Sequence, residues 1–127
     1  MIVVDASVVI ALLDRGDAHH ENARALAEAH AADGFLIHPV TLTEVLVGAV
    51  RNGRGTQRLA ELTAIGIQTT HHDPNEPLFL AELRVMSGLP LPDCCVLAAA
   101  LRAGALIATF DARLARAAIS SGVGVIG

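Results

Sequence analysis

The sequence predicts an α/β domain built around a parallel sheet, and two observations support that prediction. Short apolar runs alternate along the chain with longer segments of helical periodicity, as the crossover connections between parallel strands require. The short runs are almost continuously apolar, which is typical of strands buried on both faces. A chain of 127 residues is expected to form a single domain, residues 1–127.

The expected elements follow in order along the chain. Strands are expected at residues 2–5, 35–38, 66–70, 105–109 and 123–126. Helices are expected at residues 6–13, 17–33, 41–50, 55–64, 75–87, 92–103 and 112–120. Asp17 is a candidate cap for the second helix, and Thr41 with Glu44 has the spacing of a capping box. Pro90 and Pro92 mark the break before the sixth helix.

The composition indicates an aliphatic core and few means of binding bases. Apolar residues make up 53% of the chain and aromatic residues 2%, with no Trp or Tyr. Aromatic platforms for stacking bases are therefore scarce, so any nucleic-acid binding has to rely on phosphates and metal ions. Cys94 and Cys95 lie in an apolar helical pattern and are expected to be buried free thiols. These thiols, with no charged leader and no apolar run of transmembrane length, predict a cytoplasmic protein.

The basic residues exclude several reaction classes. All nine are Arg, so the chain has no Lys. A P-loop nucleotidase, an aspartyl phosphatase of the haloacid dehalogenase type and a phosphoacceptor receiver domain each need a Lys. The phosphatase also needs an Asp where Ser7 stands. None of these rivals on similar folds therefore fits the chain.

Four acidic residues fall where strands end and helices begin. Asp5 and Asp111 each close an apolar strand, while Glu44 and Asp93 lie in the first turns of predicted helices. Ligand sites in open parallel sheets form at the carboxyl ends of the strands, so we expect the four carboxylates to meet there. The net charge of −4 argues against a nucleic-acid partner, but the chain without these four carboxylates is neutral, which weakens that objection.

A cluster of four carboxylates predicts a site for divalent cations. Acids at close range repel one another and raise one another's pKa, so clustering them implies a counterion. Two divalent ions about 3.5–4 Å apart can stabilise both oxygens of a phosphodiester displacement and activate a water molecule. Asp5, Glu44, Asp93 and Asp111 are therefore candidate catalytic and metal-binding residues, and the expected class is a metal-dependent nuclease.

Each acid also has a purely structural interpretation. Glu44 could complete a capping box, Asp111 could be the N-cap of the last helix, and Asp93 could favour the positive end of its helix. Asp5 is harder to explain in this way, because its only helical role would be to cap residues 6–13. The functional interpretation therefore depends on all four residues sharing one edge.

The segments around these acids resemble a known family. Residues 1–13 look like the opening of PIN-domain ribonucleases, specifically the VapC-type toxins of bacterial toxin–antitoxin pairs. Residues 43–48 are similar to the second motif of that family, residues 91–93 with the Ala-rich helix after them resemble the third, and residues 108–114 resemble the fourth. Ala6 departs from the Thr of many relatives without removing an acid.

This resemblance implies a three-layer α/β/α sandwich around a mostly parallel sheet of four or five strands. It implies an endoribonuclease that depends on Mg²⁺ or Mn²⁺, with an RNA substrate and a cognate antitoxin protein. Asp5 and Asp93 would be the principal metal ligands, and Glu44 and Asp111 would complete the site. A catalytically silent PIN-like module that only binds a partner is the alternative.

Other polar residues have possible roles beside the acids. Ser7 and Thr109 match polar positions of the family and are expected to orient water or phosphate. Candidate contacts to RNA or antitoxin, or simply solvated surface residues, are Arg51, Arg54, Arg58, Arg113 and Arg116. The adjacent pairs His19-His20 and His71-His72 are expected to be surface residues, because adjacent histidines rarely chelate one ion. The high apolar fraction predicts a homodimer.

Overall fold

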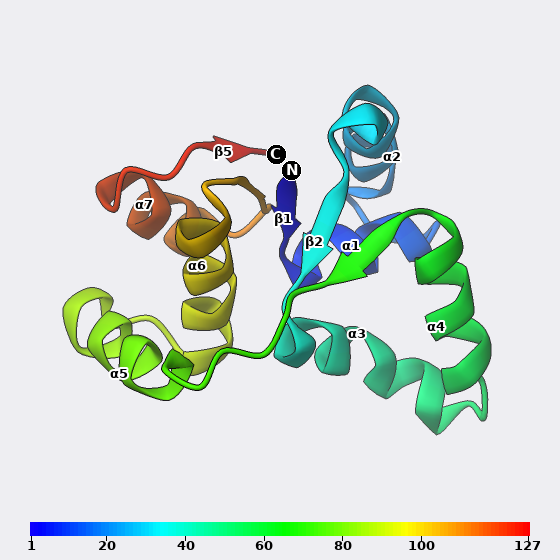
Figure 1. The fold of residues 1–127 in the computed structure, drawn as a ribbon. Coiled ribbons are helices and arrows are strands. Elements are labelled where there is room, and N and C mark those ends of the chain that lie inside the picture. The colour runs from blue at the N-terminus through cyan, green and yellow to red at the C-terminus, as the bar shows by residue number, and fades with distance from the viewer.

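The computed structural model describes residues 1–127 as a five-stranded sheet between two layers of helices (Figure 1). The strands are β1 (Ile2–Val4), β2 (Phe35–Ile37), β3 (Ile67–Thr69), β4 (Leu106–Ala108) and β5 (Val125–Ile126). The α-helices are α1 (Ala6–Leu13), α2 (His20–Ala29), α3 (Pro39–Arg51), α4 (Gly55–Ala64), α5 (Glu76–Ser87), α6 (Leu91–Ala103) and α7 (Ala112–Ser120), and a short 3-10 helix occupies Ala31–Asp33. The predicted α/β/α sandwich is confirmed.

The strand order β3-β2-β1-β4-β5 reverses beside β1. The chain builds outward from β1 through β2 to β3, and then crosses back to place β4 and β5 on the other side of β1. All neighbouring strands are parallel, and Val4 at the end of β1 is in register with Ala108 at the end of β4. The reversal point, where ligand sites form in open parallel sheets, therefore lies between the ends of β1 and β4.

Successive residues of the central strands point to opposite faces of the sheet and join two apolar cores. Val3 and Ile107 pack on the face covered by α5, α6 and α7. Ile2, Val4 and Ile37 pack on the other face, which α1 to α4 cover. In Figure 1, α5, α6 and α7 lie to the left of the central strands, and α3 and α4 lie to the right. Burial on both faces explains why the central strand β1 is apolar without alternation.

Helix α6 is the most enclosed helix of the molecule. Its residues 94–100 are all buried, and most of them are small. A helix that is apolar all round belongs inside a core, and small side chains let its neighbours approach closely. Gly104 ends the helix with a left-handed φ of 61° and returns the chain to β4. The first turn of α6, which carries Asp93, is thus attached to the best-packed part of the fold.

The start of α3 differs from the prediction. The helix begins at Pro39, and His38 is its N-cap, whose Nδ1 accepts a hydrogen bond from the Val40 N–H at 3.0 Å. The predicted capping box is wrong because Thr41 lies inside the helix, where it is fully buried. Glu44 consequently lies in the second turn of α3 and not in the first.

The start of α2 also differs from the prediction. The helix begins at His20, because Asp17 accepts a hydrogen bond from the His19 N–H at 2.8 Å and forms a turn before the helix. Both cysteines are buried and free, as predicted. No single helix has the length and apolarity to cross a membrane; α5 and α6 pass such a test only as a pair, bent by 111°.

Candidate active site

Asp5 lies at the reversal point of the sheet and is held by two hydroxyl groups. Its backbone N–H donates to the Ala108 carbonyl at 2.9 Å, which joins the ends of β1 and β4. Its Oδ2 accepts hydrogen bonds from the Ser7 hydroxyl at 2.7 Å and the Thr109 hydroxyl at 2.8 Å. The side chain makes no capping bond to α1, so the helical explanation for Asp5 fails. Its Oδ1 accepts no hydrogen bond within the protein, and that oxygen is free to bind a ligand.

The same two hydroxyl groups also order the segment after β4. The Ser7 hydroxyl accepts a hydrogen bond from the Phe110 N–H at 3.1 Å, and the Thr109 hydroxyl accepts one from the Asp111 N–H at 3.0 Å. Each hydroxyl therefore donates to Asp5 and accepts from the backbone. Ser7 and Thr109 were predicted to orient water or phosphate, and in this structure their protons are directed to Asp5.

Asp111 follows this ordered segment and caps α7. Its Oδ1 accepts hydrogen bonds from the backbone N–H groups of Arg113 at 2.8 Å and Leu114 at 3.3 Å. The structural interpretation of Asp111 as an N-cap is thus confirmed. Only one of the two carboxylate oxygens is used in this way, so capping is compatible with a second role for Asp111.

Asp93 is the residue on which the other three acids act. It lies half-buried in the first turn of α6. Burial, together with the negative charges of Asp5, Asp111 and Glu44, raises its pKa to about 6, while the Arg113 guanidinium opposes that shift. Charges must be close to act in this way. The carboxylates of Asp5, Glu44 and Asp111 therefore lie within electrostatic reach of Asp93.

Glu44 contributes to the cluster from an exposed position. It is held by α3 and not by a hydrogen bond of its own side chain. Partial desolvation of its carboxyl group raises its pKa, and the charge of Asp5 raises it further. Glu44 therefore belongs electrostatically to the same site as Asp5 and Asp93, although it faces solvent.

The donor set fits a hard divalent cation. It consists of carboxylate oxygens, which are the ligands that Mg²⁺ and Mn²⁺ prefer. Burial raises the pKa of Asp93 most, and repulsion from the other carboxylates raises it further; a bound cation would relieve that repulsion. No three Asp, Glu, His or Cys side chains converge on a common point in this structure. Ligation by more than two of the acids would therefore require side chains to turn toward the ion.

The candidate arginines differ in their distance from this cluster. Arg113 alone acts on the pKa of Asp93, and its Nη2 donates to the Gly88 carbonyl at 2.9 Å, which links α7 to the turn before α6. Arg116 and Arg51 are exposed and make no ion pair. Arg54 lies at the start of α4, where its Nε contacts Gln57 at 3.4 Å.

The two histidine pairs lie in different surroundings: His71 and His72 line the cavity beside β3, whereas His19 lines a cavity together with Thr109 and Asp111. His71 and His72 are exposed in the segment after β3, as predicted. His20 is only partly exposed, and its Nδ1 contacts the Ala11 carbonyl at 2.8 Å. His19 is exposed and stacks on Phe110 with ring centroids 4.7 Å apart. These contacts give His19 and His20 each a structural role.

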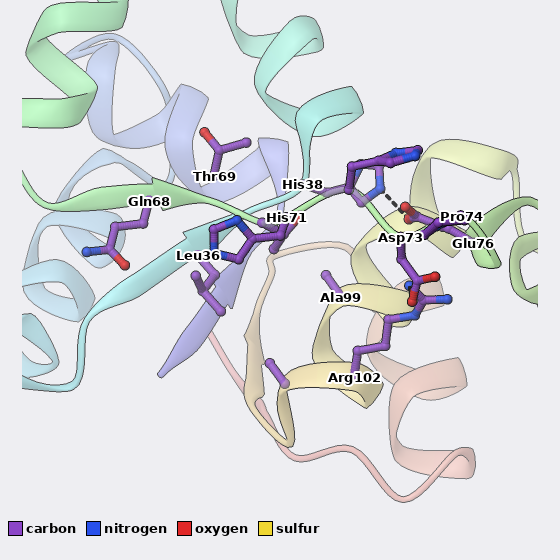
Figure 2. A pocket seen from close by; sticks show the side chains of 13 residues that line it. Leu36, His38, Gln68, Thr69, His71, Asp73, Pro74, Glu76, Ala99 and Arg102 are labelled. Atoms are coloured by element: carbon purple, nitrogen blue, oxygen red, sulfur yellow. Dashed lines mark hydrogen bonds and ion pairs between the residues drawn. The ribbon is translucent and has the colours of Figure 1, made fainter.

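His38 is a positioning residue that the sequence analysis missed. Since its Nδ1 accepts from the backbone of α3, its Nε2 carries the proton and donates to Glu76 Oε1 at 2.5 Å. Figure 2 shows this pair on the wall of a polar cavity of about 400 Å³, where Arg102 also pairs with Asp73. His38 thus fixes the start of the helix that carries Glu44. A His-Pro pair directly after a strand was the available signal.

The structure thus defines a small α/β protein with a three-layer parallel fold and a group of carboxylates near its reversal point. The chain belongs to the PIN domain family, which it matches over residues 2–120. The matched range includes all four segments on which the resemblance was based, except for Met1. No curated protein matches the sequence.

Solved structures with the same fold cover almost the whole chain. VapC20 of Mycobacterium tuberculosis, described as a sarcin–ricin loop cleaving toxin, is 21% identical with a TM-score of 0.77, covering 92% of this chain and 95% of its own. A toxin–antitoxin complex from Klebsiella pneumoniae is 21% identical with a TM-score of 0.77, covering 100% and 97%. VapBC2 from Rickettsia felis, bound to a promoter DNA fragment, is 16% identical with a TM-score of 0.74, covering 99% and 98%.

Proposed function

We propose that this PIN-domain protein is a metal-dependent endoribonuclease that acts as the toxin of a type II toxin–antitoxin pair in the cytoplasm. The observation that supports the proposal most directly is the meeting of Asp5, Glu44, Asp93 and Asp111 where the strand order reverses. The similar structures support it as well, since one is described as a sarcin–ricin loop cleaving toxin and another is a toxin–antitoxin complex.

In this proposal the four acids hold Mg²⁺ or Mn²⁺. Asp5 and Asp93 are the principal ligands, and Glu44 and Asp111 complete the site. A bound ion would supply an activated water molecule and would neutralise charge on the phosphodiester. No protein nucleophile is then needed, and the Ser7 hydroxyl in the cluster is engaged in its hydrogen bond to Asp5. The hydrolysed substrate is RNA.

The hydroxyl groups beside Asp5 support this role by orienting the carboxylate. Because Ser7 and Thr109 both donate to Oδ2, the Asp5 side chain cannot rotate without losing two hydrogen bonds. Its Oδ1 stays available for ligation. Asp93 must lose its proton before it can bind a cation, and with a pKa of about 6 it does so near neutral pH.

A separate surface supports an antitoxin partner. An apolar groove of about 440 Å³ runs between α1, α2 and the strands β2 and β3, and eleven of its thirteen lining residues are hydrophobic. Val8, Leu12, Leu26 and Phe35 are among them. Such a groove fits the apolar face of a helix or an extended segment of another protein. The apolar lining of this groove differs from the charged lining of the acidic cluster. The groove therefore suits a protein partner, and the acidic cluster suits a polar substrate.

We further propose that the protein is a homodimer. Leu78, Val85 and Met86 on α5 are 66%, 87% and 69% exposed, which leaves apolar side chains on the surface of one helix. Sedimentation at micromolar concentration without antitoxin checks this proposal. A monomer under those conditions would contradict it.

Cleavage of RNA with and without metal tests the activity. We expect the wild-type protein to cut cellular RNA in Mg²⁺ or Mn²⁺, and we expect cleavage to stop with EDTA. Asp5→Asn should lower the rate at least about 100-fold, because it removes a principal ligand while both hydroxyl groups keep an oxygen acceptor. The same result in all three conditions would instead favour the alternative of a silent module that only binds a partner.

A further inference from the structure

A second groove begins at Glu44 and leads away from the acidic cluster. It has a volume of about 470 Å³ and lies between the end of α1, one face of α3 and the start of α4. Its lining residues on α3 and at the C-cap of this helix share one face at helical spacing; they are Glu44, Val45, Gly48, Ala49 and Asn52. Because the charge of Asp5 acts on Glu44, the mouth of this groove is part of the candidate active site.

Gly48 is an unusual residue on the floor of this groove. It lies in the interior of α3, one turn after Glu44, where Gly is a poor helix former. Its φ is not positive, and a Cβ atom added to it would meet no atom within 4 Å. Neither backbone conformation nor close packing therefore requires Gly at this position. What Gly48 provides is a stretch of helix surface without a side chain, directly beside Glu44.

The far wall of the groove carries two arginines that share one acid. Arg58 Nη1 lies 2.9 Å from Glu61 Oε2, and Arg54 Nη2 lies 4.0 Å from the other oxygen of the same carboxylate. The three side chains together keep a net positive charge, and the other charged residues that line the groove are Asp14 and Glu44. Arg54 is 54% exposed, so its guanidinium is accessible from the groove. Guanidinium groups in this position suit a phosphodiester better than an apolar segment.

We propose that the RNA strand leaves the acidic cluster through this groove, passing over Gly48 with its next phosphate against Arg54 and Arg58. The inference rests on the proposed endoribonuclease activity and names the path of the substrate beside the scissile bond. In this path the missing side chain at position 48 lets the sugar–phosphate backbone approach α3. The size of the side chain at residue 48 then controls RNA entry independently of the carboxylates.

Three variants of α3 test this path. Gly48→Ala adds only a methyl group, and we expect a melting temperature roughly 4 °C higher and a loss of cleavage smaller than that of Gly48→Gln. Gly48→Gln introduces a good helix former but fills the groove, so we expect at least a tenfold loss of cleavage without a lower melting temperature. Val47→Gln is the matched control, because Val47 is 43% exposed and lies outside the groove.

Binding separates this inference from the activity on which it rests. A fluorescein-labelled mixed-sequence 20-nucleotide RNA is titrated against Gly48→Gln and Val47→Gln, each in an Asp93→Asn background, and followed by fluorescence anisotropy. We expect the dissociation constant of the Gly48→Gln protein to be at least tenfold higher. Arg58→Gln in the same background should weaken binding and reduce its salt dependence by about one phosphate contact.

Each outcome has a definite meaning. Equal cleavage and equal RNA binding by Gly48→Gln and Val47→Gln would overturn the groove as an RNA path, and would leave a protein segment as its remaining occupant. A wild-type protein that binds RNA but cuts none would overturn the activity, while the binding ratio would still decide the path. A wild-type protein that does not bind RNA would overturn both.

Discussion

The acidic cluster has two halves that are held in different ways. Asp5 and Asp111 sit at the ends of β1 and β4, and each accepts two hydrogen bonds at 3.3 Å or less. Glu44 and Asp93 project from helices and accept no hydrogen bond. Their pKa values are raised by desolvation and by neighbouring charge. Hydrogen bonds order the half formed by Asp5 and Asp111. The half formed by Glu44 and Asp93 has no such bonds and is destabilised by desolvation and by like charges.

This difference indicates how the site balances stability and binding. Hydrogen bonds to a carboxylate stabilise its charged form, whereas crowding by like charges destabilises it. Substitutions in the first half should therefore weaken the fold, and substitutions in the second should strengthen it. The repulsion in the second half is the part that a bound cation would reverse.

Thr109→Val should produce the largest change in stability. Thr109 is 3% exposed, and its hydroxyl group both donates to Asp5 and accepts from the Asp111 N–H. Removing it leaves a backbone donor unpaired and takes one donor from Asp5, which should cost about 2 kcal/mol of unfolding free energy. Urea unfolding measures this loss. Thr109→Ser is the control that keeps the hydroxyl group, and an equal loss in both variants would assign the effect to packing.

Asp93→Asn should stabilise the protein without metal. Its folded pKa of about 6 lies above the ordinary value of 3.8, so the stability linked to its proton is complete below about pH 4 and is lost as the pH rises through 6. Allowing for solvent screening, we expect a gain of about 1 kcal/mol at pH 7.5 and almost none at pH 4. Urea unfolding of both proteins at the two pH values measures this gain in unfolding free energy. A gain that did not depend on pH would contradict the electrostatic cause.

Addition of Mg²⁺ sharpens the same comparison. A cation that binds only the folded protein raises its stability by mass action, by roughly 1.4 kcal/mol at ten times its dissociation constant. We expect this gain in the wild-type melting curve at pH 7.5 and expect most of it to be absent from Asp93→Asn. An equal gain in both proteins would place the cation elsewhere.

Glu44→Gln should give the smallest change. Glu44 faces solvent, so water screens the repulsion from Asp5. We expect a gain of a few tenths of a kcal/mol in urea unfolding at pH 7.5, together with a loss of RNA cleavage. A gain as large as that of Asp93→Asn would show that the two residues are equally crowded.

The positions of the acids were predictable from the sequence, whereas their surroundings were not. Apolar runs that end in Asp5 and in the segment before Asp111 locate the ends of strands, and the order of strands and helices then brings those ends to one edge. The bonds from Ser7 and Thr109 to Asp5 join residues two and 104 positions apart. Local pattern carries no signal for the longer of these contacts.

The first turn of α3 shows why local rules can also mislead. Thr41 and Glu44 have the spacing of a capping box, but Pro39 is suited to the first helical position and His38 accepts the hydrogen bond of the cap. Two competing caps lay within four residues, and packing decided between them. Thr41 is instead buried with its hydroxyl group unpaired.

The enclosure of α6 has a consequence for motion. Amides buried in the centre of a fold exchange with solvent only when much of the molecule opens, while helices at the surface exchange through local opening. Residues 94–100 should therefore be among the slowest to take up deuterium, and α3 should exchange faster. The position of Asp93 would stay fixed while the outer helices open locally, and the geometry around Glu44 would fluctuate on a shorter timescale.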